Sequence, residues 1–310
     1  MIYEYALDPE VMANWENFKF FSSHFGFERG RLISRFPNKW EKMIISFCEK
    51  NTSLSPINRA RIVEYLSNEK LNFKNKFVRN ARNYVPNISW INNAKNSHNE
   101  KQFHAIISNE DDDNILKVDD IDEHCHLWKV ETALPVKRRA SEIVKYLKPF
   151  FEMMSELLFV DRFFNPEEEK YYKAFRIYFN HIFCLDKDFK RIEIHTGKNQ
   201  EFDLDIFIDN FVKNFRDVIP ENKTVTAYIW DRLYKGENIH PRYLLTEKGG
   251  INIDHGFDNG VGDETTDISI LSNELHKKRW ENFQPGNNTF QLINKIAFTK
   301  ENNELKYTLA

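Results

Sequence analysis

The chain has 310 residues, of which 41% are hydrophobic and 15% aromatic, so it can bury one or two sizeable cores and is not a disordered chain. Charged residues make up 29%, and the formal net charge is only −3. This balance excludes a globally basic nucleic-acid binder, although a local basic face remains open.

The cysteines and the amino terminus bear on the compartment. The three cysteines, Cys48, Cys125 and Cys184, are odd in number and far apart, which favours a reducing environment over a disulfide framework. The first residues lack the basic-then-apolar order of a signal peptide. No apolar run reaches the roughly 18 residues that span a bilayer. We therefore expect a cytoplasmic protein.

Residues 1–135 are predicted to form a mixed α+β domain of no recognised type. Asp8-Pro9-Glu10 has the form of a helix start, with proline in the first turn. Further helices are predicted over 40–47 and 55–66, and strands over 103–107 and 126–130. The acidic block at 110–113 lies between those strands and is predicted to be a solvated loop, because it lacks the glycine and the glutamate of a calcium loop.

A basic stretch within this domain is a candidate nucleic-acid contact. Lys74, Lys76, Arg79 and Arg82 lie there with aromatic residues between them. The same pattern equally fits a basic amphipathic helix whose aromatic side is buried. Nearby, residues 124–126 read His-Cys-His, but no second ligand pair has zinc-finger spacing, so we expect no metal site.

Residues 136–310 alternate strands and helices more regularly. Helices are predicted over 141–154, 167–183 and 203–215, strands over 157–160, 191–194 and 224–230, and a hairpin from 243–245 to 251–253. This order predicts an α/β fold with a central mixed sheet flanked by helices. Because such sheets bind ligands beyond the carboxyl ends of their strands, Asp161, His195 and Lys198 are candidate phosphate-binding residues.

One motif in this domain carries chemistry. His240 is followed by Arg242 and, five residues later, by Glu247, and a glycine and an asparagine follow at Gly256 and Asn259. The segment resembles the signature of the phospholipase D superfamily, in which His-x-Lys, four residues and Asp precede Gly-Ser-x-Asn. Arginine here replaces the lysine, glutamate replaces the aspartate, and the serine is lost.

The resemblance implies a metal-independent reaction at phosphorus. His240 would be the nucleophile, Arg242 and Asn259 would hold the phosphate with Thr246 nearby, and Glu247 would orient the site. Two copies of the motif are needed and the chain supplies one, so the resemblance implies a homodimer or a related partner protein. It implies no metal and no cofactor.

Two functions remain open at this point. The first is a phosphodiesterase, most readily a nuclease acting on nucleic acid in bacterial phage defence or on mobile elements. The second is an inactive binding or scaffold module that docks on nucleic acid or on a partner protein, which the altered motif favours. A lipid-headgroup binder is a weaker third option, because the sequence shows no amphipathic membrane anchor.

Overall fold

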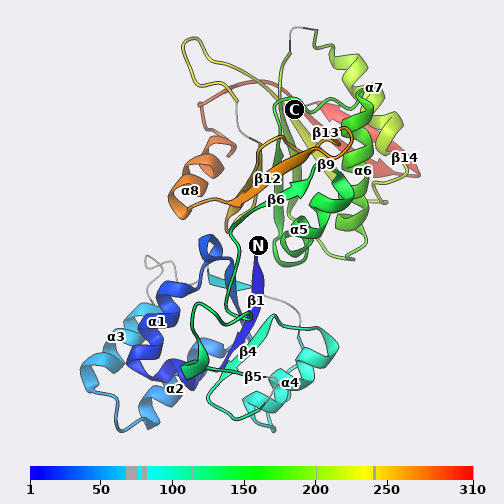
Figure 1. Ribbon diagram of the computed structural model, residues 1–310. Coiled ribbons are helices and arrows are strands. Elements are labelled where there is room, and N and C mark those ends of the chain that lie inside the picture. The colour runs from blue at the N-terminus through cyan, green and yellow to red at the C-terminus, as the bar shows by residue number, and fades with distance from the viewer. Residues whose placement is uncertain (68–75, 79–81, 113–114, 200, 240–241, 310) are drawn as a thin grey trace. The chain divides into compact units, whose positions relative to one another are not determined.

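The computed structural model in Figure 1 describes residues 1–67, 76–78, 82–112, 115–199, 201–239 and 242–309. The chain forms two compact units, Met1–Thr132 and Ala133–Ala310, which divide close to the boundary predicted near residue 135. Each unit has its own sheet, and both are of the α/β class. The units are called unit 1 and unit 2 below.

Unit 1 alternates strands and helices along the chain. In order, its strands and α-helices are β1 (Tyr3–Leu7), α1 (Trp15–His24), β2 (Arg31–Ser34), α2 (Trp40–Lys50), α3 (Pro56–Ser67), β3 (Phe77–Val78), α4 (Trp90–Glu100), β4 (Ala105–Ser108) and β5 (Ile115–Lys117). Short 3-10 helices span Val11–Ala13, Phe27–Arg29 and Val118–Asp120. The predicted helices at 40–47 and 55–66 and the strand at 103–107 are confirmed in their positions.

The sheet of unit 1 corrects the expectation of a mixed α+β domain. Its described strands follow the order β3-β2-β1-β4-β5, and every neighbouring pair is parallel. Strand β1 was not predicted, and the helix expected from Asp8 begins later, at Trp15, where the Asn14 side chain caps it. Tyr5, Ala6 and Leu7 are fully buried, as in a central parallel strand that is covered on both faces.

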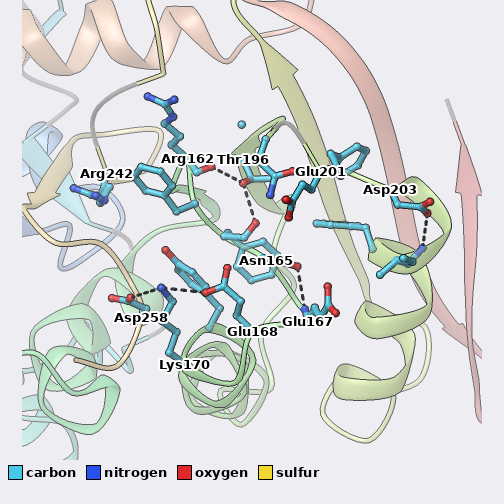
Figure 2. Close-up of a pocket in the computed structure, with 18 of the residues that line it drawn as sticks. Arg162, Asn165, Glu167, Glu168, Lys170, Thr196, Glu201, Asp203, Arg242 and Asp258 are labelled. Atoms are coloured by element: carbon cyan, nitrogen blue, oxygen red, sulfur yellow. Dashed lines mark hydrogen bonds and ion pairs between the residues drawn. The ribbon is translucent and has the colours of Figure 1, made fainter. Parts of the chain in front are cut away.

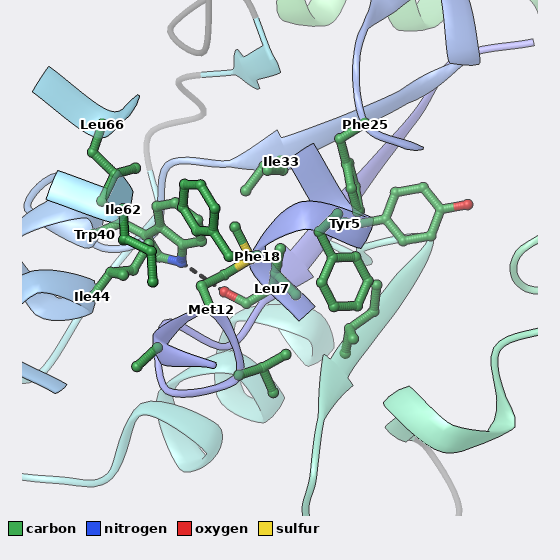
Figure 3. Packing of buried hydrophobic residues seen from close by; sticks show 14 of the residues in the cluster. Tyr5, Leu7, Met12, Phe18, Phe25, Ile33, Trp40, Ile44, Ile62 and Leu66 are labelled. Carbon is green, nitrogen blue, oxygen red and sulfur yellow. Dashed lines mark hydrogen bonds between the residues drawn. The ribbon is translucent and has the colours of Figure 1, made fainter. Parts of the chain in front are cut away.

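Figure 3 shows the packing on one face of this sheet, where Trp40 is the largest fully buried side chain. Its indole Nε1 donates to the carbonyl oxygen of Leu7 at 2.6 Å, so the ring fills the core and its polar atom is satisfied. The predicted strand at 126–130 is wrong. Residues 122–128 form turns, in which Asp122 Oδ1 accepts from the N–H groups of His124 and Cys125.

Unit 2 contains the candidate site. In order, its strands and α-helices are β6 (Ala133–Lys137), α5 (Ala140–Met153), β7 (Glu156–Val160), α6 (Glu169–Phe183), β8 (Arg191–Gly197), α7 (Leu204–Phe215), β9 (Thr224–Asp231), β10 (Tyr243–Leu245), β11 (Gly250–Ile253), β12 (Thr265–Ile270), α8 (Asn273–Asn282), β13 (Gln291–Glu301) and β14 (Glu304–Leu309). The three predicted helices, three predicted strands and the hairpin are confirmed in their positions.

The sheet of unit 2 is mixed, as the sequence predicts. Its described strands follow the order β14-β13-β9-β8-β7-β10-β11-β12-β6. Strands β7, β8 and β9 are parallel neighbours, and β10 runs antiparallel beside β7. Figure 1 shows α5, α6 and α7 on one side of this sheet and α8 on the other. The carboxyl ends of β7 and β8 therefore meet at one edge, next to the start of β10.

Candidate functional site

A cavity of about 270 Å³ lies at this edge of unit 2. Figure 2 shows the residues around it: they come from the loop that joins β7 to α6, from the end of β8, from the loop into α7 and from the two segments that flank the β10–β11 hairpin. Parallel strands bring these segments together because their carboxyl ends share one edge of the sheet. We call this cavity the strand-end pocket.

Gly256 allows the tightest contact in the pocket wall. Its φ of +91° lies in the left-handed region, which favours glycine. A Cβ at this position would lie 2.3 Å from Asp161 Oδ2 and 2.7 Å from Arg242 Cδ. The loop after β11 can therefore lie directly against Asp161 and Arg242 only because residue 256 has no side chain. The glycine predicted from the motif is a geometric requirement of this wall.

Asp161 also holds the loop after β11 in place. It is fully buried, and its two carboxylate oxygens accept from the backbone N–H groups of Phe257 and Phe163, each at 3.0 Å. Burial raises the pKa of Asp161 to about 6, although the two N–H groups and the nearby Arg242 act in the opposite direction. The Asp161 side chain thus holds the pocket wall in place, and its negative charge is lost as the pH falls below about 6.

Arg242 is only partly satisfied by the protein. Its Nη1 donates to the carbonyl oxygen of Asp254 at 2.5 Å. Its Nε is buried, lies 3.9 Å from Asp161 Oδ1 and has no hydrogen-bond acceptor within the described part of the chain. Arg242 and Arg162 each lie 5.3 Å from the centre of the Phe163 ring, which is 50% exposed. Two guanidinium groups therefore flank one exposed aromatic ring at the pocket.

Asp258 fixes the other end of the loop. It is 1% exposed, and both of its oxygens accept from Nη2 of Arg138, at 2.6 and 2.8 Å. Next to it, Asn259 Oδ1 accepts from the backbone N–H of Ala140 at the start of α5. The side-chain oxygen of Asn259, predicted to be a phosphate ligand, therefore ties the loop to a helix, and Asn259 is not among the residues that line the pocket.

Two further motif residues have structural contacts instead of the predicted ones. The Glu247 carboxylate accepts from the N–H and hydroxyl of Ser155 and from the N–H of Glu156, at the amino end of β7. That is the end of the strand opposite to Asp161, so Glu247 does not orient the pocket. Thr246 Oγ1 donates to the carbonyl oxygen of Gly249 within the β10–β11 turn. Neither residue lines the pocket.

His195 was also predicted to bind phosphate, and the structure buries it completely. The Trp230 indole donates to His195 Nδ1 at 3.1 Å, so the proton of the neutral ring lies on Nε2 and is donated to Glu193, also at 3.1 Å. Burial lowers the pKa of His195, which keeps the ring neutral. Lys198 is exposed and does not line the pocket. His195 is a core residue.

The predicted nucleic-acid contacts of unit 1 do not form a basic surface where the structure describes them. Lys76 Nζ donates to the carbonyl oxygens of Ser22 and Phe25, at 2.7 and 2.6 Å. The side chain of Arg82 is 2% exposed and pairs with Glu4 at 2.8 Å. Both cations are thus used inside unit 1. Lys74, Arg79 and the motif histidine His240 lie outside the described residues.

Sequence reasoning missed most of the polar residues of the pocket, among them Arg138, His255 and Asp258. His255 and Asp258 flank the predicted glycine, so proximity to Gly256 was an available signal. Arg138 comes from the segment between β6 and α5, more than a hundred positions away, and no local pattern marks it. Arg162 directly follows Asp161, but it was not predicted to be a site residue.

Unit 1 also has a polar pair at the carboxyl ends of two adjacent strands. Ser108 at the end of β4 donates to Asp8, just after β1, at 2.7 Å. The acidic loop beyond β4 is paired with lysines, because Asp111 lies 2.7 Å from Lys117 and Asp112 lies 2.6 Å from Lys95. Across the described ranges, no group of three or more His, Cys, Asp or Glu residues is placed to hold a metal ion.

Comparisons with known proteins give little to set beside this geometry. No protein-family model and no curated protein matches the chain. A solved structure of TrmBL2, described as an archaeal chromatin protein with a novel mode of DNA binding, matches with 13% identity and a TM-score of 0.28. The match covers 50% of this chain and 52% of that one, so it spans about half the length of TrmBL2. Similarity at this level does not establish a shared function. Among the described residues, no helix is long and apolar enough to cross a membrane.

Proposed function

We propose that unit 2 binds the phosphate group of a phosphate ester in the strand-end pocket, and that the unit is of the phospholipase D-like class. The observation that carries the proposal is Arg242. Its side chain is 25% exposed and lines the pocket, and its Nε has no acceptor in the described part of the chain, which costs about 1–3 kcal/mol. A phosphate oxygen is a suitable acceptor, because guanidinium groups bind phosphate through paired N–H groups.

The surrounding wall supports an anion in this place. Arg162, whose guanidinium also lies 5.3 Å from the centre of the Phe163 ring, has no ion-pair partner among the residues described. Arg138 and Lys170 also line the pocket but are paired with Asp258, at 2.6 and 3.7 Å. Arg162 therefore has no ion-pair partner in the described chain, and Arg242, although it lies 3.9 Å from Asp161, makes no hydrogen bond to that carboxylate.

The chain order supports descent from the phospholipase D-like class. The order that fits the resemblance is a strand that ends at Asp161, a helix, a strand that ends at His195, a helix, and then the edge that leads to His240. Strands β7, β8 and β9 with α6 and α7 follow that order, and Arg242 immediately precedes β10. The loop that contains Gly256 then lies against Asp161 and Arg242, two residues that are far apart in the sequence.

We propose binding without turnover as the main activity. Hydrolysis by the mechanism that the motif implies needs two histidines at one phosphate. His195 has both ring nitrogens engaged and does not line the pocket, so it is not the second histidine. Hydrolysis would therefore require His240 together with His255, which lines the pocket, or with His240 of a second chain. Measuring hydrolysis decides between a binding module and a phosphodiesterase.

The test is calorimetric titration of the full chain with inorganic phosphate and with dimethyl phosphate. Arg242→Ala should weaken binding about tenfold or more, because a hydrogen bond to a charged group contributes about 1.5–3 kcal/mol. Lys198→Ala removes an exposed cation outside the pocket and is the control. Unchanged affinity in Arg242→Ala would contradict the proposal.

Turnover is tested separately by hydrolysis of DNA and RNA in EDTA, compared between the wild type and His240→Ala. Equal rates would exclude hydrolysis through His240.

A further inference from the structure

The sheet of unit 2 ends at strand β14, which has a neighbour on one side only in the described sheet (Figure 1). An edge strand leaves one row of backbone N–H and C=O groups without partners in the sheet, and proline or a bulge commonly protects such a row. Strand β14 reads Glu-Leu-Lys-Tyr-Thr-Leu, without proline, and its register with β13 has no bulge. It is therefore an edge that can accept a further strand.

One face of β14 is apolar and only partly covered. Leu305, Tyr307 and Leu309 alternate with polar residues, so they share one face of the strand. Leu305 is 6% exposed, whereas Tyr307 and Leu309 are 48% and 55% exposed. The residues of β13 that lie opposite Tyr307 and Leu309, Phe298 and Ile296, are fully buried. The apolar face of the sheet therefore continues onto β14, beyond the part that the described chain covers.

Helix α7 forms the second wall of a groove on this face. Apolar side chains of both elements, Ile208 and Tyr307 among them, line a groove of about 690 Å³, which we call the edge groove. The ring of Phe211 in α7 stacks on Phe298 at 3.9 Å between ring centres, which holds the helix over β13 and leaves β14 open. A strand laid along β14 can pair with its backbone and place every second side chain in the edge groove.

Charged side chains at the edge groove indicate which partner fits. Lys213 and Arg216, at the carboxyl end of α7, are exposed and have no ion-pair partner in the ranges that the structure describes. Lys306 also lines the groove, and Asp209 is its one lining carboxylate among the described residues. This excess of positive charge attracts acidic residues and repels a second copy of the same groove.

We propose that the edge groove binds an extended, acidic segment of a partner protein. The segment adds to the sheet as a further strand beside β14. Its apolar side chains, at every second position, lie between Tyr307 and Ile208, and its acidic residues meet Lys213 and Arg216. Among the described residues, none that lines the edge groove also lines the strand-end pocket, so the two sites are independent.

The probe is a fluorescein-labelled peptide of about six residues, the length of β14, in which valine alternates with threonine and two glutamates follow at one end. It is made with the glutamates at either end, because β14 can accept a parallel or an antiparallel strand. Fluorescence anisotropy with the full chain measures binding. In the better orientation, the acidic peptide should bind about fivefold more tightly than the same peptide with two lysines, the size expected for exposed charge pairs.

Backbone methylation tests whether the peptide pairs as a strand. Successive N–H groups of a strand point to opposite edges, so methylation of every second nitrogen blocks one edge of the peptide and leaves the other free. Of the two peptides methylated in this way, one should lose binding and the other should keep it. Equal binding by both would show that the peptide lies in the groove without pairing with β14, and the proposal would be wrong.

The apolar contact is tested with the double variant Tyr307→Ser, Leu309→Ser. It should weaken binding of the acidic peptide about tenfold, because each of the two side chains exposes about half of its surface to the groove. Val261→Ser is the control, because Val261 is 80% exposed and lies outside the groove. Urea denaturation establishes that each variant is folded.

The charge preference is tested by reversal. Lys213→Glu with Arg216→Glu should make the lysine peptide the tighter ligand, whereas Lys277→Glu with Lys278→Glu, two exposed cations on α8, should not. Absence of binding by any of the peptides up to about 1 mM would overturn the proposal, as would unchanged affinity in the serine double variant. A dimer of the full chain in sedimentation equilibrium that the serine double variant dissociates would show that a second copy occupies the groove, and would also overturn it.

Discussion

Arg82 in unit 1 and Arg242 in unit 2 are both held beside a buried carboxylate, yet their surroundings differ. Arg82 donates from Nε and Nη2 to Glu4, at 3.2 and 2.8 Å, and from Nη1 to Ser97 Oγ at 3.1 Å. Arg242 lies 3.9 Å from Asp161, too far for a hydrogen bond, and its Nε has no acceptor in the described chain. The protein therefore occupies the donors of Arg82, whereas Nε of Arg242 is a donor that the described chain leaves unoccupied.

The difference separates a structural cation from a binding cation. The side chain of Arg82 is 2% exposed, whereas that of Arg242 is 25% exposed and lines a cavity. A buried arginine with every donor satisfied stabilises the fold and cannot bind a ligand without breaking those bonds. An arginine that lines a cavity and has an unsatisfied donor can bind a ligand without breaking hydrogen bonds within the protein. The following predictions test this distinction.

The largest expected effect is on stability in unit 1. Arg82→Ala leaves the buried Glu4 carboxylate without its partner and should lower the free energy of unfolding by about 3–5 kcal/mol. Arg242→Ala removes a partly exposed side chain and should lower it by no more than about 1 kcal/mol. Urea denaturation of both variants measures the contrast. Equal losses would mean that Arg242 is also a structural residue.

The next effect concerns the glycine that lies against Arg242 and Asp161. Gly256→Ala adds a Cβ that would lie 2.3 Å from Asp161 Oδ2, so we expect a loss of about 2–4 kcal/mol in stability together with loss of phosphate binding. Gly286→Ala is a matched control. It also has a positive φ, of +82°, but nothing lies within 4 Å of its Cβ, so it should show only the backbone strain of about 1 kcal/mol. If both variants lose equal stability, the close contact at Gly256 is unimportant.

A smaller effect distinguishes the pocket from the core beside it. His195→Gln loses stacking on Tyr228, whose ring centre is 4.7 Å away, and disturbs the bond to Glu193. It should destabilise the protein by about 1–3 kcal/mol yet change phosphate affinity by less than about twofold. Chemical denaturation and titration with dimethyl phosphate measure the two quantities. A large loss of affinity without loss of stability would instead show that His195 contributes to phosphate binding.

Much of the fold of unit 2 could be predicted because its helices and central strands have strong apolar periodicity. Helix α5, for example, buries Ile143, Leu147 and Phe150 on one face. The edge strand β14 was missed although Leu305, Tyr307 and Leu309 alternate with polar residues, which is the pattern of a strand. In unit 1, β1 was missed because the five residues Tyr3–Leu7 are too few for their pattern to distinguish a strand from a helix, and the strand is determined by its pairing with β2 and β4.

The position of the site could also be predicted only in part. The carboxyl ends of strands identify the edge where polar residues gather, but they do not identify the face. Val160 lies opposite His195 in the parallel register, and both side chains are buried in the core on the α8 side. Asp161 and Thr196 each follow by one position and turn to the other face, where the pocket lies. A one-residue step therefore separates a core histidine from the pocket wall.

The smallest expected effect is a dependence of binding on pH through Asp161. Its folded pKa of about 6 is raised by burial, with Asp258 acting in the same direction and Arg242 and two backbone N–H groups opposing it. Because the folded value lies above the unfolded value of about 3.9, the group's contribution to stability is present at low pH and is lost as pH rises through about 6.

Protonation of Asp161 also removes the negative charge 3.9 Å from Arg242 Nε. The affinity for dimethyl phosphate, whose charge is constant over this range, should therefore rise about threefold or more from pH ~8 to pH ~5. Asp161→Asn should bind more tightly at the higher pH and lose this dependence. His255 lines the same pocket and is titratable, so the titration is repeated in His255→Gln; if the pH dependence disappears there and persists in Asp161→Asn, the charge that controls Arg242 is that of the histidine.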